Sequence, residues 1–108
     1  HLAVAQKFLF ETNPEKARAI CRPELTMHLA MPNYINHFQR LGFAPEELQN
    51  GGSDRLIDAL FAWGPVDEVK RRIREHFEAG ATHVCIRPLH APGDFAARDA
   101  MLAEMADL

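Results

Sequence analysis

Cysteine is scarce in this sequence, and its scarcity excludes two kinds of protein. Only Cys21 and Cys85 occur among the 108 residues, and they lie far apart. Two distant cysteines do not make the disulfide framework of a small secreted domain, nor do they have the close spacing of a structural zinc site. Reduced cysteine behaves as a small hydrophobic residue. We therefore expect both to be free thiols buried in the interior.

Long apolar runs and blocks of one charge are also missing. No apolar segment approaches the ~20 residues that span a bilayer. The opening run HLAVAQKFLF lacks the basic start and the small-residue cleavage site of a secretion signal. Lysine and arginine number 12 against 15 aspartates and glutamates, a formal net charge of −3. These features predict a soluble, cytoplasmic protein with neither a membrane nor a nucleic acid as its partner.

The motifs of metal and catalytic sites are absent as well. No pair among the six histidines has the helical spacing of a zinc motif, so we expect no bound metal. The sequence has no nucleophile beside a base, no glycine-rich phosphate loop and no pair of carboxylates at a useful spacing. It therefore leaves the catalytic residues unassigned. The histidines are His1, His28, His37, His76, His83 and His90.

The residues that are present are typical of one globular domain covering residues 1–108. The composition, 47% hydrophobic and 25% charged, is ordinary for a folded domain, and the length leaves room for only one. The first residue is His1 rather than methionine, and the chain enters directly on an apolar run. We therefore expect the sequence to begin within a fold.

Two segments have the pattern of strands. Residues 2–11 are apolar, with Gln6 and Lys7 as polar interruptions, and residues 82–89 are rich in β-forming side chains. Parallel strands are normally covered by helices within a larger sheet, and two strands do not make such a sheet. Either another chain completes the pair, or this polypeptide is a segment of a bigger fold.

Most of the remaining chain is predicted to be helical. After the first strand, either Thr12 and Glu15 form a capping box or Asn13 caps a helix that starts at Pro14. Pro23 predicts a kink or break in that helix. The last third has the order helix, glycine stop, strand, loop and helix, which is an α/β unit. Further helices are predicted over 24–31, 33–41, 45–48, 53–63, 66–79 and 95–105.

Several segments, taken in order, carry a family resemblance. They are FETNPEKARAI (10–20), MPNYIN (31–36) with RLGF (40–43), GSDRLIDAL (52–60), WGPVDEV (63–69) and AGATHV (79–84). In this order they resemble the C-terminal third of luciferase-like monooxygenases, particularly those that use the deazaflavin F420. The resemblance implies an α/β chain that is the C-terminal fragment of a (β/α)8 TIM barrel of roughly 250 residues or more. This fragment would be mostly helical and hold the last two strands.

The resemblance also implies a function, namely part of a flavin- or F420-dependent oxidoreductase with a small-molecule substrate. In such enzymes the cofactor, F420 or FMN, is the redox agent, and the protein binds and orients it. By this resemblance most cofactor-holding residues lie outside the chain, so we expect the fragment alone to be inactive.

A second class of function fits the predicted helix content. It is a non-enzymatic helical module that self-associates by pairing its strands with those of a second copy. A homo-oligomer is expected.

Five polar residues are candidates for the site, because barrel enzymes carry their chemistry at the carboxyl ends of the strands. Arg87 and His90 would hold a phosphate or carboxylate of the cofactor, or else form a solvated strand end. Glu11 would line the mouth as a substrate-binding residue, or else only support the helix cap. The resemblance puts Tyr34 and Asn36 on the substrate side; the alternative is that Tyr34 packs and Asn36 faces water.

Overall fold

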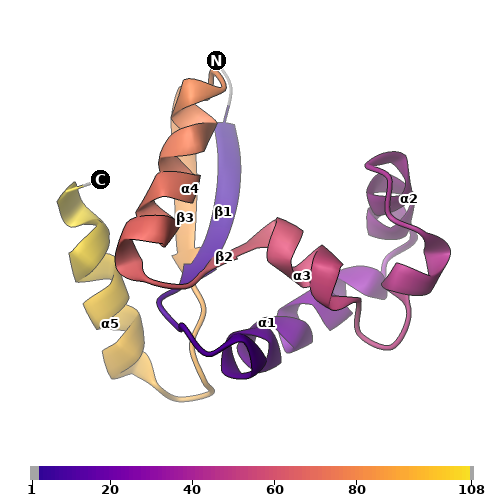
Figure 1. Ribbon diagram of the computed structural model, residues 1–108, viewed down its shortest axis with the longest axis horizontal. Coiled ribbons are helices and arrows are strands. Elements are labelled where there is room, and N and C mark those ends of the chain that lie inside the picture. The colour runs from indigo at the N-terminus through magenta and orange to yellow at the C-terminus, as the bar shows by residue number, and fades with distance from the viewer. Residues whose placement is uncertain (1–2, 108) are drawn as a thin grey trace.

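The chain folds into a small parallel sheet with helices around it (Figure 1), and the computed structural model describes residues 3–107. It is an α/β structure in which 59% of the residues are helical, which confirms the prediction of a mostly helical α/β chain. The elements, in chain order, are β1 (Ala3–Leu9), α1 (Pro14–Leu29), α2 (Pro32–Arg40), a 3₁₀ turn (Pro45–Leu48), α3 (Asp54–Leu60), β2 (Phe61–Trp63), α4 (Val66–Glu78), β3 (His83–Pro88), α5 (Phe95–Glu104) and a final 3₁₀ turn (Met105–Asp107).

The sheet has three parallel strands in the order β2-β1-β3. The sequence predicts only two strands and is wrong about β2. Leu60 and Phe61 continue the apolar period of α3, which extends the predicted helix to Trp63. A three-residue strand is too short to show the alternation that marks a strand. Phe61 and Ala62 nevertheless lie beside β1 and are buried there.

The two predicted strands are present with shorter bounds. β1 covers Ala3–Leu9 where 2–11 is predicted, and β3 covers His83–Pro88 where 82–89 is predicted. Leu2 lies outside the described residues. After Leu9 the chain leaves the sheet. It turns so that Asn13 lies directly before the first turn of α1, which its side chain caps.

Helix α1 begins as one of the two alternatives predicts and continues where the sequence predicts a break. The Asn13 side chain caps it by accepting hydrogen bonds from two backbone amides of the first turn, at 3.0 and 3.2 Å. The break at Pro23 is wrong, since α1 runs through it to Leu29. A proline costs the helix one hydrogen bond, but burial of one helix face on both sides of Pro23 offsets that loss. The buried residues are Ala17, Cys21 and Leu25.

The two faces of the sheet differ in their cover. Register partners in parallel strands point to the same side, so the even-numbered residues of β1 and β3 share one face and the odd-numbered residues share the other. α4 packs on the even-numbered face, where Phe8 is fully buried and the Gln6 side chain lies 2.9 Å from His76 Nε2. On the odd-numbered face, Ala3, Ala5, His83 and Cys85 are exposed.

The cysteines are both free thiols, but only one of them is buried. Cys21 lies in the core as predicted, and burial raises the pKa of its thiol to about 12. The prediction of a buried Cys85 is wrong. Cys85 has an odd-numbered position on the edge strand β3 and therefore points away from α4.

Candidate functional site

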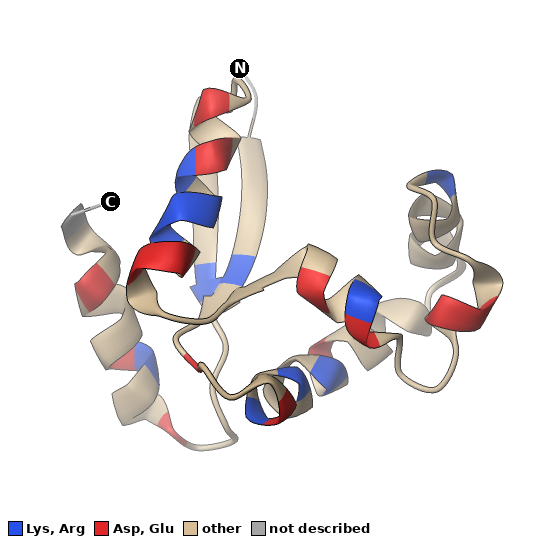
Figure 2. Ribbon diagram, in the orientation of Figure 1, with Lys and Arg blue, Asp and Glu red and all other residues tan. Residues whose placement is uncertain are grey.

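Basic side chains gather at the carboxyl end of the sheet. Lys7 on β1 and Arg87 on β3 are register partners and therefore share the odd-numbered face. Figure 2 shows a basic segment near the carboxyl end of each of these strands. Helix α1 runs past the carboxyl ends of the strands (Figure 1), and its residue Glu24 pairs with both cations. Its Oε1 accepts from Lys7 Nζ at 2.8 Å and from Arg87 Nη1 at 2.6 Å. The side chains of Glu24 and Lys7 are 13% and 23% exposed, so water shields their pair weakly, whereas Arg87 is 62% exposed and its pair with Glu24 is more strongly shielded.

The bridge keeps Glu24 charged and leaves a neighbouring histidine neutral. Burial opposes ionisation of Glu24, but the hydrogen bond and charge of Lys7, together with Arg87, outweigh it and lower the pKa of Glu24. His28 lies one turn further along α1, with Nε2 at 3.4 Å from Lys7 Nζ. Burial, and then the charge of Lys7, lower the pKa of His28, so its ring is neutral at neutral pH. Two cations, one anion and one neutral ring leave the cluster with an excess of one positive charge.

Acid should weaken the fold partly through Glu24. A carboxyl group whose pKa is lowered by folding stabilises the folded state above its unfolded pKa of ~4.3, and this stabilisation is lost as the pH falls through the folded value. We expect Glu24→Gln to be less stable than wild type at neutral pH and to lose less stability between about pH 5 and about pH 3. Urea unfolding at each pH, followed by circular dichroism, measures this. The exposed Glu78→Gln should keep the wild-type pH dependence, and a matching change in that variant would contradict the role of Glu24.

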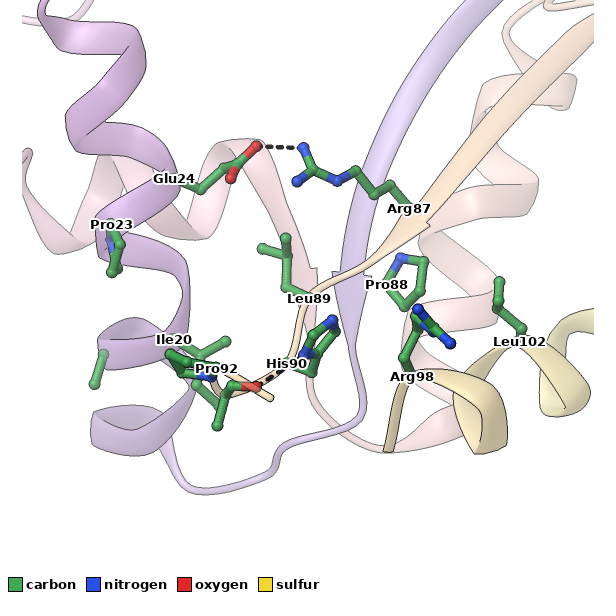
Figure 3. Close-up of a pocket in the computed structure, with 12 residues that line it drawn as sticks. Ile20, Pro23, Glu24, Arg87, Pro88, Leu89, His90, Pro92, Arg98 and Leu102 are labelled. Atoms are coloured by element: carbon green, nitrogen blue, oxygen red, sulfur yellow. Dashed lines mark hydrogen bonds and ion pairs between the residues drawn. The ribbon is translucent and has the colours of Figure 1, made fainter. Parts of the chain in front are cut away.

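Two hollows flank the bridge. The first, here called the carboxyl-end hollow, has a volume of about 480 Å³ and is lined by Glu24, Arg87, His90 and Arg98 (Figure 3). The structure therefore brings the two predicted cofactor-binding residues, Arg87 and His90, to one hollow. It adds Arg98 from α5, which the sequence does not single out. The Arg98 guanidinium carbon lies 4.8 Å from the centre of the Phe95 ring, which holds the side chain against its own helix.

The second hollow, here called the odd-face hollow, has a volume of about 270 Å³. It is walled largely by rings, and Tyr34, predicted on the substrate side, is one of them. The Tyr34 and His28 rings lie 4.5 Å apart between centres, and Tyr34 and Phe38 lie 6.1 Å apart. Its lining includes Lys7, His28, Tyr34, His37, Phe38 and Phe61.

The remaining predicted residues, Glu11 and Asn36, lie outside these two hollows. Glu11 Oε1 accepts a hydrogen bond from the Asn13 amide at 3.0 Å and thereby supports the start of α1. Glu11 also lines a further hollow of about 350 Å³, together with His90. Asn36 is exposed on α2, where its backbone carbonyl accepts from Arg40 Nε at 3.4 Å. The structure thus groups Glu11, Arg87 and His90 around the carboxyl end and sets Asn36 apart.

Neither a metal-binding cluster nor a membrane-spanning helix occurs within residues 3–107. No group of three or more His, Cys, Asp or Glu side chains in this part of the chain is arranged to hold a metal ion. Within the same residues no helix has both the length and the apolar character needed to cross a membrane.

Comparisons with protein-family models, curated proteins and solved structures found no match. The site is therefore interpreted from its own geometry.

Proposed function

We propose that this chain is the C-terminal part of a (β/α)8 barrel oxidoreductase of the luciferase-like type, using F420 or FMN to act on a small-molecule substrate in the cytoplasm. The observation that carries the proposal is the placement of Lys7 and Arg87 on adjacent parallel strands, close to their carboxyl ends. Barrel enzymes build their sites at this end of the strands. At this end of the barrel, the charged groups of Lys7 and Arg87 would face the cofactor and the substrate.

The uneven cover of the sheet also supports the proposal. α4 covers the even-numbered face, whereas Ala3, Ala5, His83 and Cys85 leave much of the odd-numbered face exposed. Parallel sheets in complete proteins are covered on both faces or closed into a barrel. Further strands that curl over the odd-numbered face would enclose it as the inside of a barrel, with α4 outside and α1 across the mouth.

The carboxyl-end hollow suits the anionic tail of such a cofactor. Its volume of about 480 Å³ lies in the range of ~300–1,000 Å³ that is usual for ligand pockets. Arg87 donates one N–H to Glu24 and Arg98 donates Nε–H to Asp99 at 3.0 Å. Their remaining guanidinium N–H groups can bind phosphate or carboxylate. His90 Nδ1 lies 2.8 Å from the Ala91 carbonyl and must therefore donate to it, which orients the ring. When bound, the cofactor would supply the redox chemistry, the two arginines would hold its tail, and the oriented His90 ring would line the hollow beside it.

The gene upstream of His1 tests the barrel part of the proposal. We expect the same reading frame to encode about six further βα units before this segment. The intact mass of the protein from its source cells should match that longer product. An initiation codon directly before His1, with a cellular protein of the mass of these 108 residues, would contradict the proposal.

In the intact protein, Arg87→Gln is expected to weaken cofactor binding about tenfold or more, because a hydrogen bond to a charged group contributes about 1.5–3 kcal/mol. Quenching of cofactor fluorescence gives the dissociation constant. Riboflavin, which lacks the phosphate of FMN, should bind both forms equally. Arg74→Gln, an exposed change on α4, serves as the matched control, and an equal loss there would count against a specific role for Arg87.

A second candidate function is a self-associating module without catalytic activity. The observation that favours it is that β2 and β3 are both edge strands, since an edge strand presents backbone groups that can pair with another chain. Light scattering tests it on the chain as it stands. A dimer that keeps its helical circular dichroism would support this candidate, and a stable monomer would exclude it.

A further inference from the structure

We infer that the odd-face hollow binds a small planar aromatic monoanion, such as a single ring that carries one carboxylate or phenolate. This inference deepens the proposed function by naming a class of substrate, and it rests on the proposed function only in calling the bound molecule a substrate. Three properties of the hollow support it, namely its walls, its one ammonium group and the charge balance around that group.

Aromatic rings make up much of the wall of the hollow. Phe38 from α2 and Phe61 from β2 are 4% and 2% exposed, so they are fixed by packing. Tyr34 lies against both Phe38 and His28, with ring centres 6.1 and 4.5 Å apart. Aromatic rings pack on one another in offset or edge-to-face geometry at such separations. With about 270 Å³, the hollow lies just below the ~300–1,000 Å³ that is usual for ligand pockets and suits one ring rather than a large cofactor.

Lys7 provides the ammonium group that lines the hollow. Glu24 Oε1 at 2.8 Å and His28 Nε2 at 3.4 Å take two of its N–H bonds, and a lysine has three. The third can be donated to a ligand oxygen. The Lys7 side chain is 23% exposed, so a bond to it would be shielded from water and stronger than one at the surface.

The charge at the hollow favours a monoanion. Among the residues that line it, Lys7 is the one lysine or arginine, whereas Arg87 and Glu24 line the carboxyl-end hollow. One negative charge on the ligand would pair with the Lys7 ammonium group, and a cation would be repelled by it.

Benzoate tests the inference on the chain itself. We expect saturable binding of benzoate in an NMR titration, with benzamide, which lacks the charge, bound about tenfold more weakly. Cyclohexanecarboxylate, which keeps the charge and lacks the flat ring, should bind severalfold more weakly, as expected for the loss of about 0.5–1.5 kcal/mol of ring contacts. Lys7→Met should lose about tenfold in benzoate affinity, whereas the exposed Lys16→Met should keep the wild-type value.

A second measurement needs no variant and therefore stands even if Lys7→Met does not fold. Saturating benzoate should protect Lys7 from acetylation by acetic anhydride, and Lys16 in the same sample should react at an unchanged rate, as read from peptide masses. Absence of saturable benzoate binding, equal binding of benzamide, or equal protection of Lys16 would each overturn the inference. The reading frame upstream of His1 decides the barrel proposal separately, so the two failures are distinguishable.

Discussion

Gly52→Ala is expected to destabilise the domain by about 2–5 kcal/mol, because a left-handed backbone and an overlap act together. Gly52 has φ +93°, a conformation that side chains disfavour, and an added Cβ would overlap Cδ2 of Leu25, which is fully buried. Urea unfolding followed by circular dichroism gives the free energy. A domain of this kind has about 5–15 kcal/mol of stability in total, so the loss should lower the unfolding midpoint substantially.

Gly42→Ala is the matched control for the overlap. Gly42 has φ +103°, close to that of Gly52, yet no atom lies within 4 Å of an added Cβ. It should therefore lose only the backbone contribution of about 1–2 kcal/mol. If both variants lose the same stability, the contact with Leu25 is not what makes Gly52 necessary.

The elements that the sequence predicts well are those whose signals are local. The cap at Asn13 is set by its own amide oxygen and the first turn, and α4 is marked by an apolar period that includes Val69 and Ile73, both fully buried. Errors arise where tertiary packing decides. β2 exists because Phe61 and Ala62 gain burial beside β1, and α1 passes Pro23 because its apolar face is buried on both sides.

The candidate site also divides into residues that local sequence signals predict and contacts that tertiary packing decides. Arg87 and His90 are found from the sequence because they follow a recognisable strand, and barrel chemistry is expected at strand ends. The bridge from Lys7 to Glu24 is missed, since it depends on the course of α1 past the sheet. The sequence does contain one sign of this bridge. A lysine within a mostly apolar strand loses hydration when the strand is buried, so it must find a hydrogen-bond acceptor to offset that loss. Arg98 gives no such signal, being an arginine on an ordinary surface helix.

Leu25→Ala should cost about 2–5 kcal/mol, the range for removing a large buried side chain and leaving a cavity. Leu25 is fully buried on α1, whereas Met27, two residues further along, is 61% exposed. Met27→Ala should therefore change stability by no more than about 0.5 kcal/mol. Both values come from the same urea unfolding measurement. A similar loss in the two variants would mean that α1 is not oriented as described.

The double variant of Leu25→Ala and Gly52→Ala then tests the contact itself. Removing the Leu25 side chain takes away the atoms that an alanine at position 52 would overlap, so the second change should cost less in this background than in wild type. Contacting residues typically show interaction energies of about 0.5–3 kcal/mol. Strict additivity would contradict the contact. Since Leu25 and Glu24 are consecutive residues of α1, the packing that Gly52 permits also fixes the part of the helix from which Glu24 reaches Lys7 and Arg87.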